Sequence, residues 1–147
     1  MSLDEPLGDT YVAAIQHGLV DIPENATLVG VVRHPTGWFH AAVDENYQAL
    51  GLSADLLETF KQRHEDLKLH GMCDEGAHNA AWDELDVSGR YRSQLTNNPT
   101  AQQAVEDLLD RLRTGEHLVL VCFENTDKKR CHRTLLKSHI KAQLGDD

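Results

Sequence analysis

The sequence predicts a small single α/β domain in which helices flank a mainly parallel sheet, giving three layers. Apolar side chains run almost without interruption through residues 27–32 and 118–123, as expected of buried strands. Helical periodicity precedes and follows the second of these segments, at residues 100–114 and 131–144. Strands that alternate with helices imply βαβ units, a largely parallel sheet and helices on both of its faces. At 147 residues, the chain has the size of one domain.

The N-terminal part predicts an arm, a short helix and the first strand. Residues 1–8 are expected to form a loose arm. Asp9 is a suitable N-cap for a helix that Gly18 would end. The strand at residues 27–32 follows, and Arg33 comes directly after it, before a turn that contains proline and glycine.

The central part predicts a loop and several helices. Residues 38–51 are expected to form a loop with a helical turn, and Ser53 caps a helix that runs to about His64. Residues 67–70 predict a short strand, followed by a loop over residues 71–76. Two short helices are then expected at residues 77–85 and 87–95, with Trp82 and Tyr91 facing the core.

A break at Asn97-Asn98-Pro99 separates these helices from a longer one. Thr100 and Gln103 have the spacing of a capping box, and Gly115 is placed to end the helix. One face of this helix is apolar, so it is expected to pack directly on the sheet.

The segment between the last strand and the last helix holds the candidate reactive group, Cys131. Backbone N–H groups and the helix dipole at a helix N-terminus stabilise anions, including a thiolate. Residues 128–144 contain six lysines and arginines and no acid. We therefore predict that Cys131 is a nucleophile and that His132 or Glu124 assists it. Glu124 could orient His132 or pair with an arginine. The alternative is that Cys131 is a half-buried structural thiol.

Arg33, Arg133 and Cys122 are the candidate anion-binding residues. Arginine makes bidentate contacts with carboxylates and phosphates. In open parallel sheets, ligands bind beyond the carboxyl ends of the strands. Arg33 and the segment 122–133 would converge there if their two strands are neighbours. Salt bridges from the arginines to Glu124, and a core position for Cys122, are the alternatives.

Three stretches of the chain resemble one known family. A Cys-x-Glu motif at residues 122–124 and a Cys-His-Arg motif at residues 131–133 resemble the C-terminal signature of the domain of unknown function 488 (DUF488) family. Val-Arg followed by Pro at residues 32–35, and the helical segment at residues 82–95, are also similar to that family. Val31 stands where the family often has Asp, so no acid role is expected there. The resemblance implies a fold and a site, and no settled reaction.

Charge and composition limit the class of partner. The net charge is −10, and outside residues 128–144 eight basic residues face twenty-four acidic ones. This acidic protein is a poor general binder of duplex nucleic acid. An anionic small molecule or nucleotide in a focused basic pocket fits better. The chain has no run of eighteen apolar residues and an odd number of cysteines, three, so we expect no membrane span and a cytoplasmic location. The oligomeric state is left open.

Neither a metal nor another cofactor is predicted. His70, Cys73 and His78 place three ligand types in one nine-residue segment. A structural zinc site needs four ligands, so His64 or a distant cysteine would have to complete the set. The phosphatase loop is absent, because Lys128 stands six positions after Cys122 where that loop requires Arg. Zinc-deaminase and glycine-rich phosphate-binding motifs are absent as well.

Two hypotheses of different classes therefore follow. The first is an enzyme in which Cys131 attacks an anionic substrate. The second is a non-catalytic module in which the same helix N-terminus binds a small anion, a nucleotide or a nucleic-acid end.

Overall fold

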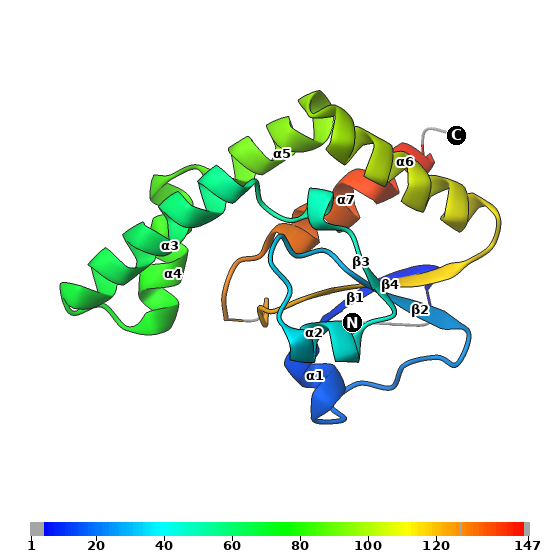
Figure 1. The fold of residues 1–147 in the computed structure, drawn as a ribbon, viewed down its shortest axis with the longest axis horizontal. Coiled ribbons are helices and arrows are strands. Elements are labelled where there is room, and N and C mark those ends of the chain that lie inside the picture. Colours follow the sequence, from blue (N-terminus) through cyan, green and yellow to red (C-terminus); the bar gives the residue numbers. More distant parts are fainter. Residues whose placement is uncertain (1–4, 127, 146–147) are drawn as a thin grey trace.

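The computed structural model describes residues 5–126 and 128–145, and its centre is one parallel sheet (Figure 1). The strands lie in the order β1-β4-β2-β3. Their bounds are Leu7–Tyr11 (β1), Ala26–Gly30 (β2), Glu45–Asn46 (β3) and His117–Cys122 (β4). β4 lies between β1 and β2 and pairs in parallel with both. The predicted parallel sheet is confirmed, and β2 and β4 are neighbours.

Helices lie on both sides of this sheet, as the prediction of an α/β domain requires (Figure 1). Their bounds are Val12–Gln16 (α1), Gly37–Ala42 (α2), Ala54–Leu69 (α3), Asp74–Glu84 (α4), Val87–Asn97 (α5), Pro99–Arg113 (α6) and His132–Gly145 (α7), with a 3₁₀ turn at Gln48–Leu50 (η1). In the picture, α1 and α2 lie below the sheet and α6 and α7 above it, while α3 and α4 extend to one side as a helical hairpin.

The core forms where β4 meets α6 and α7. The residues from Leu118 to Cys122 are buried, as expected of a central strand that is covered on both faces. The apolar face of α6 is buried as predicted, and Leu136 and Ile140 bring α7 to the same core. Trp82 and Tyr91 are buried too, which confirms the inward orientation predicted for them.

The prediction for the N-terminus was wrong. Leu7 and Gly8 belong to β1 and are buried, so the residues before the first helix are no loose arm as far as the structure describes them. Residues 1–4 of the predicted arm lie outside the described part. Asp9 lies in the strand opposite Leu120 and caps no helix. α1 begins only at Val12. The segment forms a strand although its sequence has a weak strand pattern, because the edge of β4 provides hydrogen-bond partners for its backbone.

Two other local predictions were wrong. Residues 67–70 are not a strand: α3 continues to Leu69, because packing against α4 stabilises its last turn. The capping box at Thr100 is not used either. Asn98 is the N-cap of α6, its side-chain oxygen accepts from the N–H of Ala101 at 3.0 Å, and Pro99 occupies the first turn.

Two of the predicted loops also contain more regular structure than expected. Residues 38–51 contain part of α2, then β3 and η1, and β3 adds a short edge strand beside β2. The loop predicted over residues 71–76 is shorter, because α4 begins at Asp74. Cys73 is the N-cap of that helix, and its sulfur accepts from the N–H of Gly76 at 3.3 Å.

Candidate functional site

The candidate site is a cavity of about 240 Å³ beyond the carboxyl ends of β2 and β4. One side is formed by the segments that follow these strands, and the other by α3 and α4. Its lining residues are Val32, Arg33, His34, Leu52, Leu57, Phe60, Lys61, His64, His78, Trp82, Cys122, Phe123, Glu124, Lys129, Arg130, Cys131 and His132. Five of the six predicted site residues are therefore brought together, and Arg133 is not among the lining residues. A more open hollow of about 520 Å³ between α3 and the α5–α6 junction is lined by neither cysteine nor histidine.

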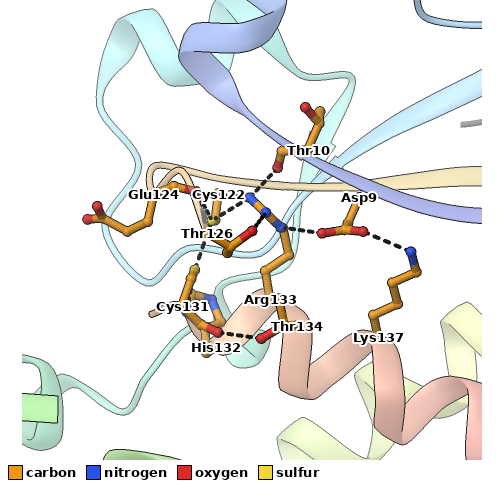
Figure 2. A network of polar contacts seen from close by, with 10 residues as sticks. All are labelled: Asp9, Thr10, Cys122, Glu124, Thr126, Cys131, His132, Arg133, Thr134 and Lys137. Atoms are coloured by element: carbon orange, nitrogen blue, oxygen red, sulfur yellow. Dashed lines mark hydrogen bonds and ion pairs between the residues drawn. The ribbon is translucent and has the colours of Figure 1, made fainter. Parts of the chain in front are cut away.

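Two cysteines of the cavity lining lie side by side (Figure 2). Cys122 ends β4 and Cys131 directly precedes α7, so the loop between them returns the chain to the strand end. Their sulfur atoms are 2.8 Å apart. Both side chains are almost completely buried, with 1% and 4% of Cys122 and Cys131 exposed. The two thiols thus form one coupled group.

Arg133 lies behind the two cysteines and is completely buried. Its guanidinium donates only to groups of the protein within the described part of the chain. These contacts are Nε to Asp9 Oδ2 (2.7 Å), Nη1 to the carbonyl oxygens of Thr10 (2.6 Å) and Glu124 (3.1 Å) and to Cys122 Sγ (3.1 Å), and Nη2 to Thr126 Oγ1 (2.9 Å). Lys137 also contacts Asp9, at 2.8 Å. Arg133 therefore supports the strand ends from within the core and does not line the cavity.

This support favours a thiolate at Cys131. Burial opposes ionisation of Cys131, but three interactions outweigh it: a hydrogen bond from the Cys122 thiol, one from the backbone N–H of Arg133, and the charge of its guanidinium. Together they lower the pKa of Cys131. Burial and the neighbouring Cys131 raise the pKa of Cys122 well above its usual value. The Cys122 thiol therefore stays protonated and donates a hydrogen bond to the sulfur of Cys131.

His132 is held in one tautomer beside Cys131. Its Nε2 lies 2.5 Å from the carbonyl oxygen of Val31. A carbonyl only accepts hydrogen bonds, so Nε2 carries the proton and Nδ1 has a free lone pair in the neutral ring. Burial lowers the pKa of His132, which favours this neutral form. Nδ1 lies 3.6 Å from Cys131 Sγ and is placed to accept the proton of the thiol.

Glu124 contributes to the site in two different ways. Its backbone carbonyl accepts from Arg133. Its carboxylate points away from that guanidinium (Figure 2) and lies 3.9 Å from Lys129 Nζ. The carboxylate of Glu124 therefore forms no ion pair with Arg133, which was one of the alternatives. Nor does this carboxylate orient His132, because the Val31 carbonyl holds that ring.

Arg33 reaches the cavity wall from the segment that follows β2. Nε donates to the Leu52 carbonyl at 2.9 Å, and Nη2 lies 3.4 Å from the Gly51 carbonyl. Gly51 is needed at this approach, because a Cβ atom there would lie 2.3 Å from the backbone nitrogen of Arg33. The two carbonyls orient the guanidinium and leave its charge without a carboxylate partner in the described part of the chain.

Comparison with known proteins identifies the family. A family model described as "Active DUF488-N3 subclade" matches residues 17–144. The chain belongs to the DUF488 family. The family predicted from the sequence is confirmed by this match. Neither a curated protein nor a solved structure matches the chain. β1 precedes the matched range, so Asp9 and Thr10, which hold Arg133, come from outside it.

One wall of the cavity in this family member is a group of aromatic and histidine side chains that the sequence analysis did not assign to the site. Phe60, His64, His78 and Trp82 come from α3 and α4, and their rings contact one another. His78 is anchored by the carbonyl of Arg130 at 2.8 Å, and burial lowers its pKa. These residues belong to a helical hairpin whose position depends on tertiary packing, so no local pattern predicts that they face Cys131.

The three ligand types at residues 70–78 do not converge. His70 Nδ1 bonds the Asp66 carbonyl, Cys73 caps α4 from an exposed position, and His78 turns toward the cavity. Over residues 5–126 and 128–145, no group of three or more His, Cys, Asp or Glu side chains is placed to hold a metal ion. In the same residues, no helix is long and apolar enough to cross a membrane.

Proposed function

We propose that this DUF488 protein is a thiol enzyme that acts on a small anionic substrate, with Cys131 as the nucleophile. The observation that carries the proposal is the position of His132 between the Val31 carbonyl and Cys131 Sγ. A histidine whose distal nitrogen is held by an acceptor, and whose near nitrogen faces a thiol, has the arrangement of an activating base.

The proposed step begins with proton transfer from Cys131 Sγ to His132 Nδ1. The thiolate then forms a bond to the electrophilic atom of the substrate while the bond to the leaving group breaks. The leaving group takes the electron pair and receives the proton from His132. Arg133 stabilises the negative charge on the sulfur pair through Cys122, at 3.1 Å.

The basic residues at the cavity support an anionic substrate. Arg33, Lys61, Lys129 and Arg130 line it, and Glu124 is the one carboxylate in the lining within the described part of the chain. Lys129 is paired with Asp74 and Arg130 with Asp83, whereas Lys61 has no ion-pair partner among the described residues. Arg33 and Lys61 are therefore the cations that a ligand engages at the lowest cost.

A non-catalytic anion-binding module is the second candidate, and the burial of Cys131 favours it. Because Cys131 is only 4% exposed, its thiol reacts only with a reagent that enters the cavity. In the module, Cys131 would simply pack against Cys122 and would not react with such reagents while the protein is folded.

The test compares carboxymethylation by the anion iodoacetate with alkylation by the neutral iodoacetamide, followed at Cys131 by peptide mass spectrometry. The reference is Cys131 in the urea-unfolded protein, where the neighbouring sequence is the same and the cavity is lost. We expect the ratio of iodoacetate to iodoacetamide rates to be higher in the folded protein. Lys61→Ala should reduce this ratio and leave the iodoacetamide rate unchanged. A folded Cys131 that reacts with neither reagent would favour the binding module, and a ratio equal to that of the unfolded chain would exclude the anion pocket.

A further inference from the structure

We propose that Cys122 is the resolving cysteine of a thiol–disulfide exchange at Cys131, and that the substrate class is a small disulfide that carries carboxylates. This inference rests on the proposed role of Cys131 as a nucleophile. It adds a second reacting residue, a redox reaction and a substrate class.

The geometry of the two sulfur atoms is the first observation. They are 2.8 Å apart, and closing a disulfide of about 2.05 Å requires less than about 1 Å of movement. Both cysteines line the cavity, and Cys131 is the more exposed of the two, at 4% against 1% for Cys122 at the end of β4. A substrate that enters the cavity therefore meets Cys131 first, and Cys122 is placed to attack the sulfur of Cys131.

The contact between Arg133 and Cys122 is the second observation. A cysteine that only fills the core behaves as a small apolar side chain and needs no cation beside it. Here Nη1 of a completely buried guanidinium lies 3.1 Å from Cys122 Sγ. Such a cation stabilises the thiolate that Cys122 must become when it attacks. The contact therefore suits the second step of an exchange reaction, in which Cys122 must lose its proton.

The proposed reaction balances in atoms and electrons. Cys131 gives its proton to His132 Nδ1, and the resulting thiolate attacks one sulfur of the substrate disulfide. The S–S bond of the substrate breaks, and one half leaves as a thiolate and takes the proton from His132. Cys122 then loses its proton to His132 Nδ1 and attacks the Cys131 sulfur. The second half leaves as a thiolate and takes that proton. The protein dithiol is oxidised by two electrons and the substrate disulfide is reduced to two thiols. A small thiol reverses the change and restores the dithiol.

The cavity lining selects the substrate class. Arg33 and Lys61 suit carboxylates on a disulfide that enters from solvent. The apolar rings of Phe60 and Trp82 on α3 and α4 line the cavity and suit the carbon chains beside its sulfur atoms. A cavity of about 240 Å³ has room for one half of such a molecule next to Cys131, with the leaving half toward the open side.

The experiment uses oxidised glutathione as the probe and the full chain with Cys73→Ser as the parent. This change removes the exposed third thiol and keeps a residue that caps α4 well. We expect the parent to release two molecules of reduced glutathione per chain and to lose the mass of two hydrogens. The peptides that contain Cys122 and Cys131 should then be linked by a disulfide. Adding Cys122→Ser should stop the reaction with one glutathione released and one bound to Cys131. Adding Cys131→Ser should prevent release.

The outcomes separate this inference from the proposed function. If the parent retains one glutathione on Cys131 and behaves like the Cys122→Ser variant, the resolving role is excluded and the nucleophile remains. If Cys131 reacts with neither glutathione nor iodoacetamide, both proposals fail. Should the Cys122→Ser variant not fold, as judged by circular dichroism, Cys122→Ala replaces it. The peptide link in the parent decides the question independently of either variant.

Discussion

Arg33 and Arg133 follow two neighbouring parallel strands, and they differ in what their charges contact. Arg133 is completely buried, and its contacts include one to Asp9, which lies 124 positions away in the sequence. Among the residues that the structure describes, Arg33 is held only by backbone carbonyls, and it lines the cavity. The same residue type at the same edge of the sheet thus lies buried behind the cavity in one case and lines the cavity in the other. What distinguishes them is whether a carboxylate from another strand is present.

The largest expected effect is the loss of stability in Arg133→Met. The variant leaves Asp9 buried with only Lys137 beside it and removes the donors to three backbone and side-chain oxygens. Breaking such a buried pair costs about 3–5 kcal/mol in the free energy of unfolding, measured by urea denaturation. Arg33→Met is the matched control and should cost about 1–2 kcal/mol, because only hydrogen bonds to carbonyls are lost. Equal losses would remove the distinction between the two arginines.

A smaller effect is the pH dependence that the buried His132 gives to the free energy of unfolding. Burial lowers its pKa in the folded protein, whereas the unfolded chain takes up the proton near pH 6.5. Between these two values the unfolded state binds more protons, so the free energy of unfolding falls as the pH drops below about 6.5. Each unit by which the pKa is lowered corresponds to about 1.4 kcal/mol.

His132→Gln should flatten this part of the stability curve, because its amide can still donate to Val31 and does not titrate. His78 and His139 also have pKa values lowered by burial, so part of the slope should remain. The measurement is urea denaturation of both proteins at a series of pH values. A slope that is the same in the variant would show that His132 is not the neutral, buried ring described above.

An effect smaller still is expected for ligand binding by Arg33. Arg33→Ala should lower the rate of Cys131 carboxymethylation by iodoacetate about twofold to fivefold, as expected of one partly solvated ion pair. The rate with iodoacetamide should stay the same, which controls for changes in the thiol itself. An equal decrease with both reagents would mean that Arg33 acts on the geometry of the site and does not attract the anion.

The smallest effect is predicted at Arg130, which lines the cavity but pairs with Asp83 through exposed side chains. Arg130→Ala should change the free energy of unfolding by less than about 1 kcal/mol in the same urea experiment. A loss as large as that of Arg133→Met would show that exposed and buried arginines of this segment contribute alike.

The sheet and the position of the site could be predicted from the sequence because their signals are local. The apolar run of β4, the amphipathic face of α6 and the cysteine at the start of α7 are each visible within a dozen residues. β1 was missed because its strand pattern is interrupted by Asp9. That carboxylate is compatible with a buried strand only because Arg133 and Lys137 contact it. No local rule contains this information.

Within the site, the sequence predicted which residues gather and not how they are paired. For Cys122, a core position was the alternative to anion binding. Its burial agrees with that alternative, yet its sulfur also contacts Cys131 and Arg133. Glu124 was expected to hold His132 or an arginine, and the Val31 carbonyl and Asp9 take those positions. The aromatic wall from α3 and α4 depends on how the helical hairpin packs beside the sheet, which periodicity alone does not determine.

The central claim is that Cys131 is an activated thiol, and its ionisation is the most direct test. The pH dependence of alkylation by iodoacetamide, resolved for each cysteine by peptide mass spectrometry, measures it in the intact protein. Cys131 should react as a thiolate with an apparent pKa below the ordinary value of about 8.5. The buried Cys122 should stay unreactive. If the apparent pKa of Cys131 is about 8.5 or higher, or if Cys131 does not react at any pH at which the protein is folded, the claim is contradicted.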